Sequence, residues 1–135
     1  AARFFKAYCD VLDSKYSDGY SLNLNDYMHE AILTGKWSCV NGTMFGFDVV
    51  KLYGFSPKVI FPPDHALLLI GDICCETTSG AWFPLSELDK RYPGRKTITD
   101  DTLKIQAAFY NNIGFNFAFR QHQYADALKY LGKAI

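Results

Sequence analysis

Residues 62–78, PPDHALLLIGDICCETT, decide the fold. Two apolar runs, residues 65–70 and 73–78, flank the pair Gly71-Asp72. A Gly-Asp pair between two β-prone runs is typical of a tight hairpin turn, and the preceding Pro-Pro-Asp separates the first run from what comes before it. The stretch therefore predicts an antiparallel hairpin whose first strand is opened by His65.

The two-residue turn sets the register of this hairpin. With Ile70 facing Ile73, Glu76 faces Leu67 and is a diagonal neighbour of His65 on the same face of the sheet. A carboxylate inside an apolar strand needs a polar partner, because burying it alone costs free energy. We therefore expect His65 and Glu76 to pair, whereas a shift of one residue would move Glu76 to the opposite face. A turn residue already has a local role, which makes Asp72 a weaker candidate for the acid.

The flanking sequence extends the hairpin into an α+β core over residues 1–97. Residues 58–61 and 81–84 are further strand candidates, and the polar residues 89–95, which contain Pro93-Gly94, read as a loop or linker. Apolar residues at helical spacing predict a helix over residues 3–16. Asn23 or Asn25 as a cap and Gly35 as a stop indicate a second helix over residues 25–34, and apolar residues at steps of three and four predict a third over residues 39–53. The last of these helices packs on the small antiparallel sheet in this interpretation, and Gly54 ends it.

Residues 98–135 predict a helical hairpin. Apolar positions recur at helical spacing from Asp100 to Phe117 and again from Tyr124 to Ala134, with a break at residues 120–123. The sequence contains one such unit, so it does not form a repeat array.

Composition excludes several classes of partner. The chain has 135 residues, of which 49% are hydrophobic, and its 14 basic and 14 acidic residues give a net charge of zero. Nucleic-acid and anionic-membrane surfaces usually need a basic excess, and no apolar run approaches the length of a membrane span. The N-terminal residues AARFF do not form a signal peptide as they stand, which favours a cytoplasmic location unless a targeting segment has been removed.

The cysteines suggest free thiols. Cys9, Cys39, Cys74 and Cys75 include no C-x-x-C pair, and neighbours on a strand point to opposite faces, so neither a disulfide framework nor a metal site is expected. A zinc site would need Cys74 or Cys75 to join His65. No cofactor is expected.

Cys39 is the cysteine with a chemical role in this interpretation. It stands in the first turn of a predicted helix, with Ser38 or Trp37 just outside it. The unpaired N–H groups and the dipole of a helix start stabilise a thiolate, and the same N–H groups can donate to an oxyanion. A histidine oriented by an acid can then act as the base, so Cys39, His65 and Glu76 form a candidate catalytic triad. Taken alone, each of the three also has an ordinary structural explanation.

The order of cysteine at a helix start, histidine on one strand and acid on the next resembles the transglutaminase-like superfamily of papain-type thiol enzymes. Residues 24–39, the Gly54-Phe55 bend and residues 62–68 resemble a bacterial branch in which this core precedes tetratricopeptide repeats. Residues 76–80 resemble its acid strand, and the small and large positions of residues 98–135 resemble a tetratricopeptide hairpin. This sequence has Glu76 where aspartate is commoner, and Val40 follows the cysteine where a tryptophan is frequent. Trp37 precedes it and is a candidate for positioning the oxyanion.

The resemblance implies a cysteine-dependent acyl-transfer enzyme that acts on a peptide or protein substrate. Hydrolysis is preferred to cross-linking, because the sequence offers no second cleft for an amine. The alternative is a catalytically silent transglutaminase-like scaffold that binds a partner protein through its helical hairpin. The oligomeric state is left open, a homo-oligomer included.

Overall fold

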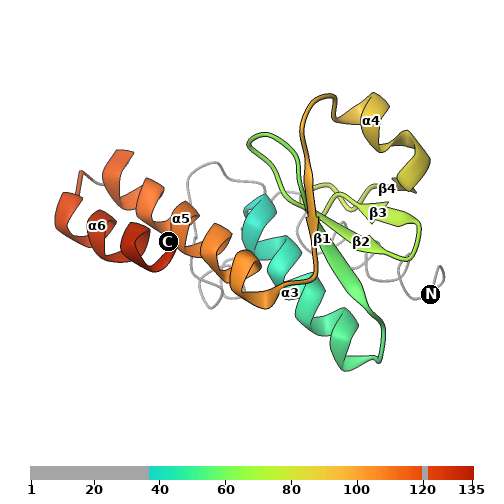
Figure 1. The fold of residues 1–135 in the computed structure, drawn as a ribbon, viewed down its shortest axis with the longest axis horizontal. Helices are drawn as coiled ribbons and strands as arrows, with labels where there is room; N and C mark the ends of the chain where they lie inside the picture. Colours follow the sequence, from blue (N-terminus) through green and yellow to red (C-terminus); the bar gives the residue numbers. More distant parts are fainter. Residues whose placement is uncertain (1–36, 120–121) are drawn as a thin grey trace.

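The computed structural model describes residues 37–119 and 122–135, which form an α+β fold (Figure 1). Five strands make one antiparallel sheet in the order β4-β3-β2-β1-β5. The strands are β1 (Pro57–Phe61), β2 (Leu67–Ile70), β3 (Ile73–Cys75), β4 (Trp82–Pro84) and β5 (Thr97–Thr99). The helices are α3 (Cys39–Leu52), α4 (Leu88–Arg91), α5 (Thr102–Phe119) and α6 (Tyr124–Lys133), with a 3-10 turn, η1 (Leu85–Glu87), before α4. The helices predicted over residues 3–16 and 25–34 lie outside the described residues.

The central hairpin has the predicted register. Ile70 pairs with Ile73, and Leu68 pairs with Cys75. Both strands are shorter than predicted, however, since β2 begins at Leu67 and β3 ends at Cys75. A turn closed by the His65 N–H on the Pro62 carbonyl (3.4 Å) precedes β2, and the N–H groups of Ser79 and Gly80 fold back onto the Glu76 carbonyl at 3.3 and 2.8 Å. His65 and Glu76 therefore lie just beyond the ladder, at the same end of the sheet.

Side chains alternate between the two faces of the sheet. One face packs against α3 and includes Val59, Leu68, Ile70 and Cys75 together with Phe47 and Val50 of the helix. The other face gathers Ile60, Leu67, Leu69, Cys74, Phe83 and Leu88. Cys74 and Cys75 thus point to opposite faces, as their position on a strand predicts.

Local sequence fixes both ends of α3. Ser38 is the N-cap: its hydroxyl accepts from the Asn41 N–H at 3.3 Å, and the Asn41 side chain accepts from the Ser38 N–H at 2.7 Å. This reciprocal pair satisfies two N–H groups that the helix start leaves without carbonyl partners. Gly54, with φ of 80°, turns the chain away at the other end, because a left-handed residue cannot continue the helix. The predicted helix, with Cys39 in its first turn, is confirmed.

The region predicted as a polar loop is more ordered than expected. Residues 88–91 form α4, and beyond the loop β5 adds to the sheet by pairing with β1. The predicted boundary between residues 97 and 98 falls inside β5. The apolar step from Leu85 to Leu88 to Tyr92 has helical spacing, and these side chains pack against the second face of the sheet. In the sequence this short apolar pattern is hard to detect, because charged residues surround it.

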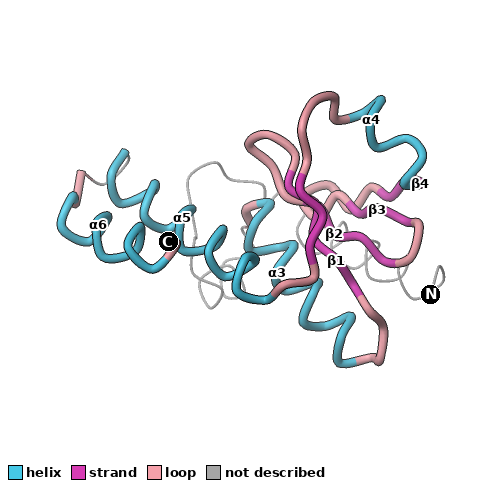
Figure 2. Tube along the Cα trace, viewed as in Figure 1, coloured by secondary structure: helices cyan, strands magenta, loops and turns pink. Residues whose placement is uncertain are grey.

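The predicted helical hairpin is present, and α6 lies along α5 (Figure 2). The helices come so close at Gly114 that a Cβ there would lie 2.7 Å from Leu131 Cγ. At its other end α5 inserts Ile105 into the core between α3 and the sheet. The hairpin is therefore anchored to the α+β core. No helix of the described residues is long and apolar enough to cross a membrane.

Candidate active site

Cys39 and His65 line the same pocket, which has a volume of about 510 Å³. Cys39 enters it from the first turn of α3, and His65 comes from the connection between β1 and β2. The opposite wall is formed by one side of α5. The remaining lining residues are Val40, Phe61, Pro62, Asp64, Ala108, Asn111, Asn112 and Phe115. The pocket thus lies between the core and the helical hairpin.

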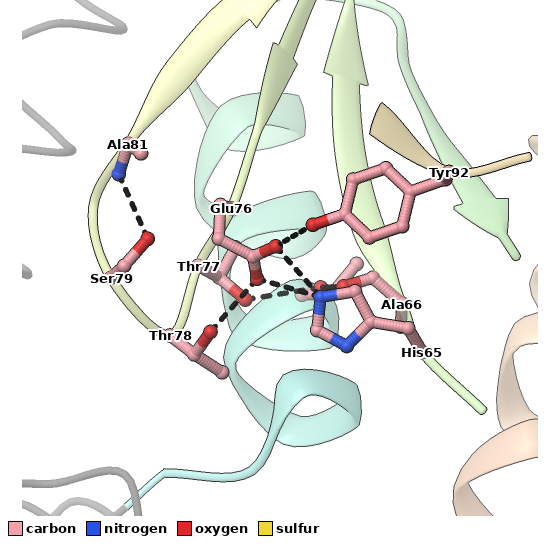
Figure 3. Close-up of polar contacts among 9 residues, drawn as sticks. His65, Ala66, Glu76, Thr77, Thr78, Ser79, Ala81 and Tyr92 are labelled. Atoms are coloured by element: carbon pink, nitrogen blue, oxygen red, sulfur yellow. Dashed lines mark hydrogen bonds and ion pairs between the residues drawn. The ribbon is translucent and has the colours of Figure 1, made fainter. Parts of the chain in front are cut away.

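His65 and Glu76 form the pair that the hairpin register predicts (Figure 3). His65 Nε2 lies 2.8 Å from both carboxylate oxygens of Glu76. The side chains are largely buried, at 16% and 13% exposure, so water screens their interaction only in part. Because Nε2 faces the carboxylate, Nδ1 is the ring nitrogen on the other side, turned away from Glu76.

Two hydroxyl groups hold the Glu76 carboxylate in place. Thr78 Oγ1 donates to Oε1 at 2.8 Å, and the Tyr92 hydroxyl donates to Oε2. The Tyr92 ring also stacks on the His65 ring, with a centroid distance of 5.5 Å and an interplanar angle of 21°. Burial and the neighbouring carboxylate raise the pKa of Tyr92, so its hydroxyl keeps the proton that it donates. No pattern in the sequence predicted Tyr92 as part of this site.

The surroundings favour a charged His65–Glu76 pair. Burial lowers the pKa of His65, but hydrogen bonds to Cys39 and Glu76, together with their charges, outweigh it and raise the pKa from 6.5 to about 10. Burial raises the pKa of Glu76, but hydrogen bonds from His65 and Tyr92 outweigh it and leave the pKa below 4.5. At neutral pH the imidazole is therefore an imidazolium held between Cys39 and a carboxylate.

The N-terminal part of α3, which carries Cys39, is tied to the segments that carry His65 and Glu76. Thr43 Oγ1 donates to the carbonyl of Ala66, next to His65, at 3.2 Å. The same hydroxyl lies 3.1 Å from the hydroxyl of Thr77, next to Glu76. Gly42 permits this approach, since a Cβ there would lie 3.0 Å from Thr77 Oγ1. Three separate segments are thereby fixed relative to one another.

The other residues that the sequence suggested for the site do not line the pocket. Trp37 is 3% exposed, packs its ring on Phe45 at a centroid distance of 5.2 Å, and is not among the residues that line the pocket. Asp72 is exposed in the turn between β2 and β3, where its carbonyl accepts from the Leu85 N–H at 2.7 Å. Cys74 is fully buried, and burial raises its pKa to about 11. Across residues 37–119 and 122–135, no three His, Cys, Asp or Glu side chains are arranged to hold a metal ion.

Comparison with models of known protein families, with curated proteins and with solved structures finds no match to this chain.

Replacing Tyr92 by phenylalanine should raise the pKa of Glu76. The variant keeps the ring beside His65 but removes one of the hydrogen bonds that stabilise the carboxylate. The carboxyl ¹³C shift of Glu76, followed by NMR against pH, measures this directly. Tyr53→Phe is the matched control, because Tyr53 is 68% exposed at the far end of α3. An unchanged Glu76 titration in Tyr92→Phe would show that the hydroxyl does not support the carboxylate.

Proposed function

We propose that this protein is a cysteine-dependent acyl-transfer enzyme that hydrolyses a peptide or amide bond. The observation that carries the proposal is the position of His65, which lines one pocket with Cys39 and bonds through Nε2 to Glu76. A base between a nucleophile and an orienting acid is the arrangement that activates a weak nucleophile.

The proposed reaction starts from the thiolate of Cys39 and the imidazolium of His65. The sulfur attacks the carbonyl carbon, and the negative oxygen that forms accepts hydrogen bonds from first-turn N–H groups of α3, that of Cys39 among them. His65 then gives its proton to the leaving amine as the carbon–nitrogen bond breaks, which leaves a thioester on Cys39. Water attacks the thioester with His65 as the base, and the acid and the thiol are released.

Glu76 serves the reaction through His65. Its carboxylate stabilises the imidazolium and keeps the Nε2 proton directed away from the pocket. Thr78 and Tyr92 are positioning residues, because both bond to Glu76.

A transglutaminase-like core is part of the proposal. A helix that starts at the cysteine packs on a small antiparallel sheet, and histidine and acid come from consecutive segments at one end of that sheet. The helical hairpin follows the sheet in the chain, where the resemblance puts a tetratricopeptide-like unit. These features support the assignment by analogy of architecture and site order.

A silent scaffold is the competing function, and the surface of the helical hairpin favours it. Leu103, Tyr124 and Leu128 are 75%, 64% and 72% exposed. Exposed apolar residues of this size can form a protein-binding surface. Such a function would not need a reactive Cys39.

Alkylation by iodoacetamide, mapped by mass spectrometry, tests the proposal. Cys39 should react rapidly near neutral pH, and His65→Gln should slow the reaction at least about tenfold, since the imidazolium no longer favours the thiolate. The fully buried Cys74 and Cys75 are internal controls and should stay unlabelled in the folded protein. Equal rates in the wild type and in His65→Gln would support the silent scaffold instead.

A further inference from the structure

One stripe of α5 forms the wall opposite the reactive pair. Ala108, Asn111, Asn112 and Phe115 all line the pocket with Cys39 and His65. They follow one another at steps of three, one and three residues, which places them on a single face of a helix. Ile105, one turn earlier on α5, is buried in the core and holds this face against the pocket.

The stripe has the chemistry of a surface that binds an uncharged peptide. Its polar groups are two carboxamides, which offer the same N–H donors and C=O acceptors as a peptide bond. Phe115 is 49% exposed and presents an aromatic surface beside them. None of the four carries a charge. The carboxylate that lines the pocket is that of the exposed Asp64, which would repel an acidic substrate.

We propose that the α5 stripe Ala108–Asn111–Asn112–Phe115 is the substrate-binding wall of the site and selects an extended, uncharged peptide segment. Asn111 bonds to the peptide backbone, and Phe115 packs against an apolar side chain of the substrate. The helical hairpin is thereby part of the active site, and specificity is set by residues of a different structural unit from those that carry the chemistry.

This inference rests on the proposed function, and the test separates the two. Two reagents that both alkylate Cys39 are compared. Iodoacetamide is too small to contact the α5 stripe, whereas an N-acetylated dipeptide chloromethyl ketone with a leucine side chain can contact it. In the second reagent the thiolate sulfur bonds to the methylene carbon and chloride leaves. Second-order rates are measured for the intact protein and its variants.

Asn111→Ala and Phe115→Ala should each slow the dipeptide reagent at least about fivefold, the effect of losing one hydrogen bond or one apolar contact. Their rates with iodoacetamide should stay within about twofold of the wild type. A reagent with aspartate in place of leucine should react more slowly than the leucine form. Gln106→Ala is the matched control, since Gln106 lies exposed on α5 outside the pocket lining.

Two results would overturn the inference: no change with the dipeptide reagent in either variant, or equal slowing of both reagents, which would indicate a general disturbance of α5. Asn111 is exposed, so its alanine variant provides the decisive measurement if Phe115→Ala does not fold. Failure of wild-type Cys39 to react with iodoacetamide would instead contradict the proposed function itself.

Discussion

Replacing Cys39 by alanine should abolish hydrolysis, with a loss of at least about 10³-fold in kcat/KM on any peptide that the wild type cleaves. The reason is that the variant has no atom to form the thioester, and only binding and oxyanion stabilisation remain. The measurement is steady-state hydrolysis of a peptide amide with an uncharged, apolar side chain at the scissile carbonyl.

The fold should survive this substitution, since Cys39 is only partly buried at the helix start and the cap depends on Ser38 and Asn41. Thermal unfolding followed by circular dichroism provides that control. Cys39→Ser keeps the shape of the side chain and should also be nearly inactive, because a hydroxyl is a much weaker nucleophile beside the same imidazolium. Activity retained in either variant would remove Cys39 from the mechanism.

Replacing Glu76 by glutamine should reduce kcat/KM by about 10²- to 10⁴-fold and shift the alkaline limb of the pH–rate profile to lower pH. In the wild type the imidazolium persists until the pH approaches about 10, so activity should fall through that range. Without the carboxylate the pKa of His65 falls, and the imidazolium is lost earlier. An alkaline limb at the same pH in both proteins would show that Glu76 does not set the charge of His65.

The same variant should alter the pH dependence of stability. The folded pKa of His65 is raised above its ordinary value of 6.5, so the contribution of the imidazolium is complete below about 6.5 and is lost as the pH rises through about 10. The folded pKa of Glu76 is lowered, so the contribution of the carboxylate is present above its ordinary value of 4.5 and is lost as the pH falls below it. Glu76→Gln should remove this part of the unfolding free energy. Glu87→Gln is the matched control, because Glu87 pairs with Arg91 at 43% exposure on the surface, where such a pair contributes little.

The central part of the fold follows from local sequence signals. Gly71-Asp72 fixes the hairpin register, and Ser38 and Gly54 mark the ends of α3; all three are short-range effects of turn and cap chemistry. The pairing of His65 with Glu76 follows from that register, even though both residues lie just past the strands. Their backbones leave the ladder because they are engaged in turns. The His65 N–H donates to the Pro62 carbonyl, and the Glu76 carbonyl accepts from the N–H groups of Ser79 and Gly80.

What could not be predicted depends on contacts between distant segments. Tyr92 reaches Glu76 only because α4 folds over the second face of the sheet, and its four residues give too short a pattern to stand out among charges. The α5 wall of the pocket depends on how the helical hairpin packs on the core through Ile105. The apolar periodicity of α5 does not determine which face of the helix lies opposite Cys39. Long-range packing of this kind leaves no local signal.

The way His65 is held has a consequence for the order of events in the proposed reaction. Its ring is stacked on Tyr92, and its Nε2 is bonded to both oxygens of Glu76, so a half-turn of the ring would break those bonds. The imidazole therefore cannot carry a proton from one side of the site to the other by rotating. A single nitrogen, Nδ1, has to protonate the departing amine and later take a proton from water. The departing amine and the attacking water must occupy the same space beside Nδ1, so the amine has to leave before water can enter.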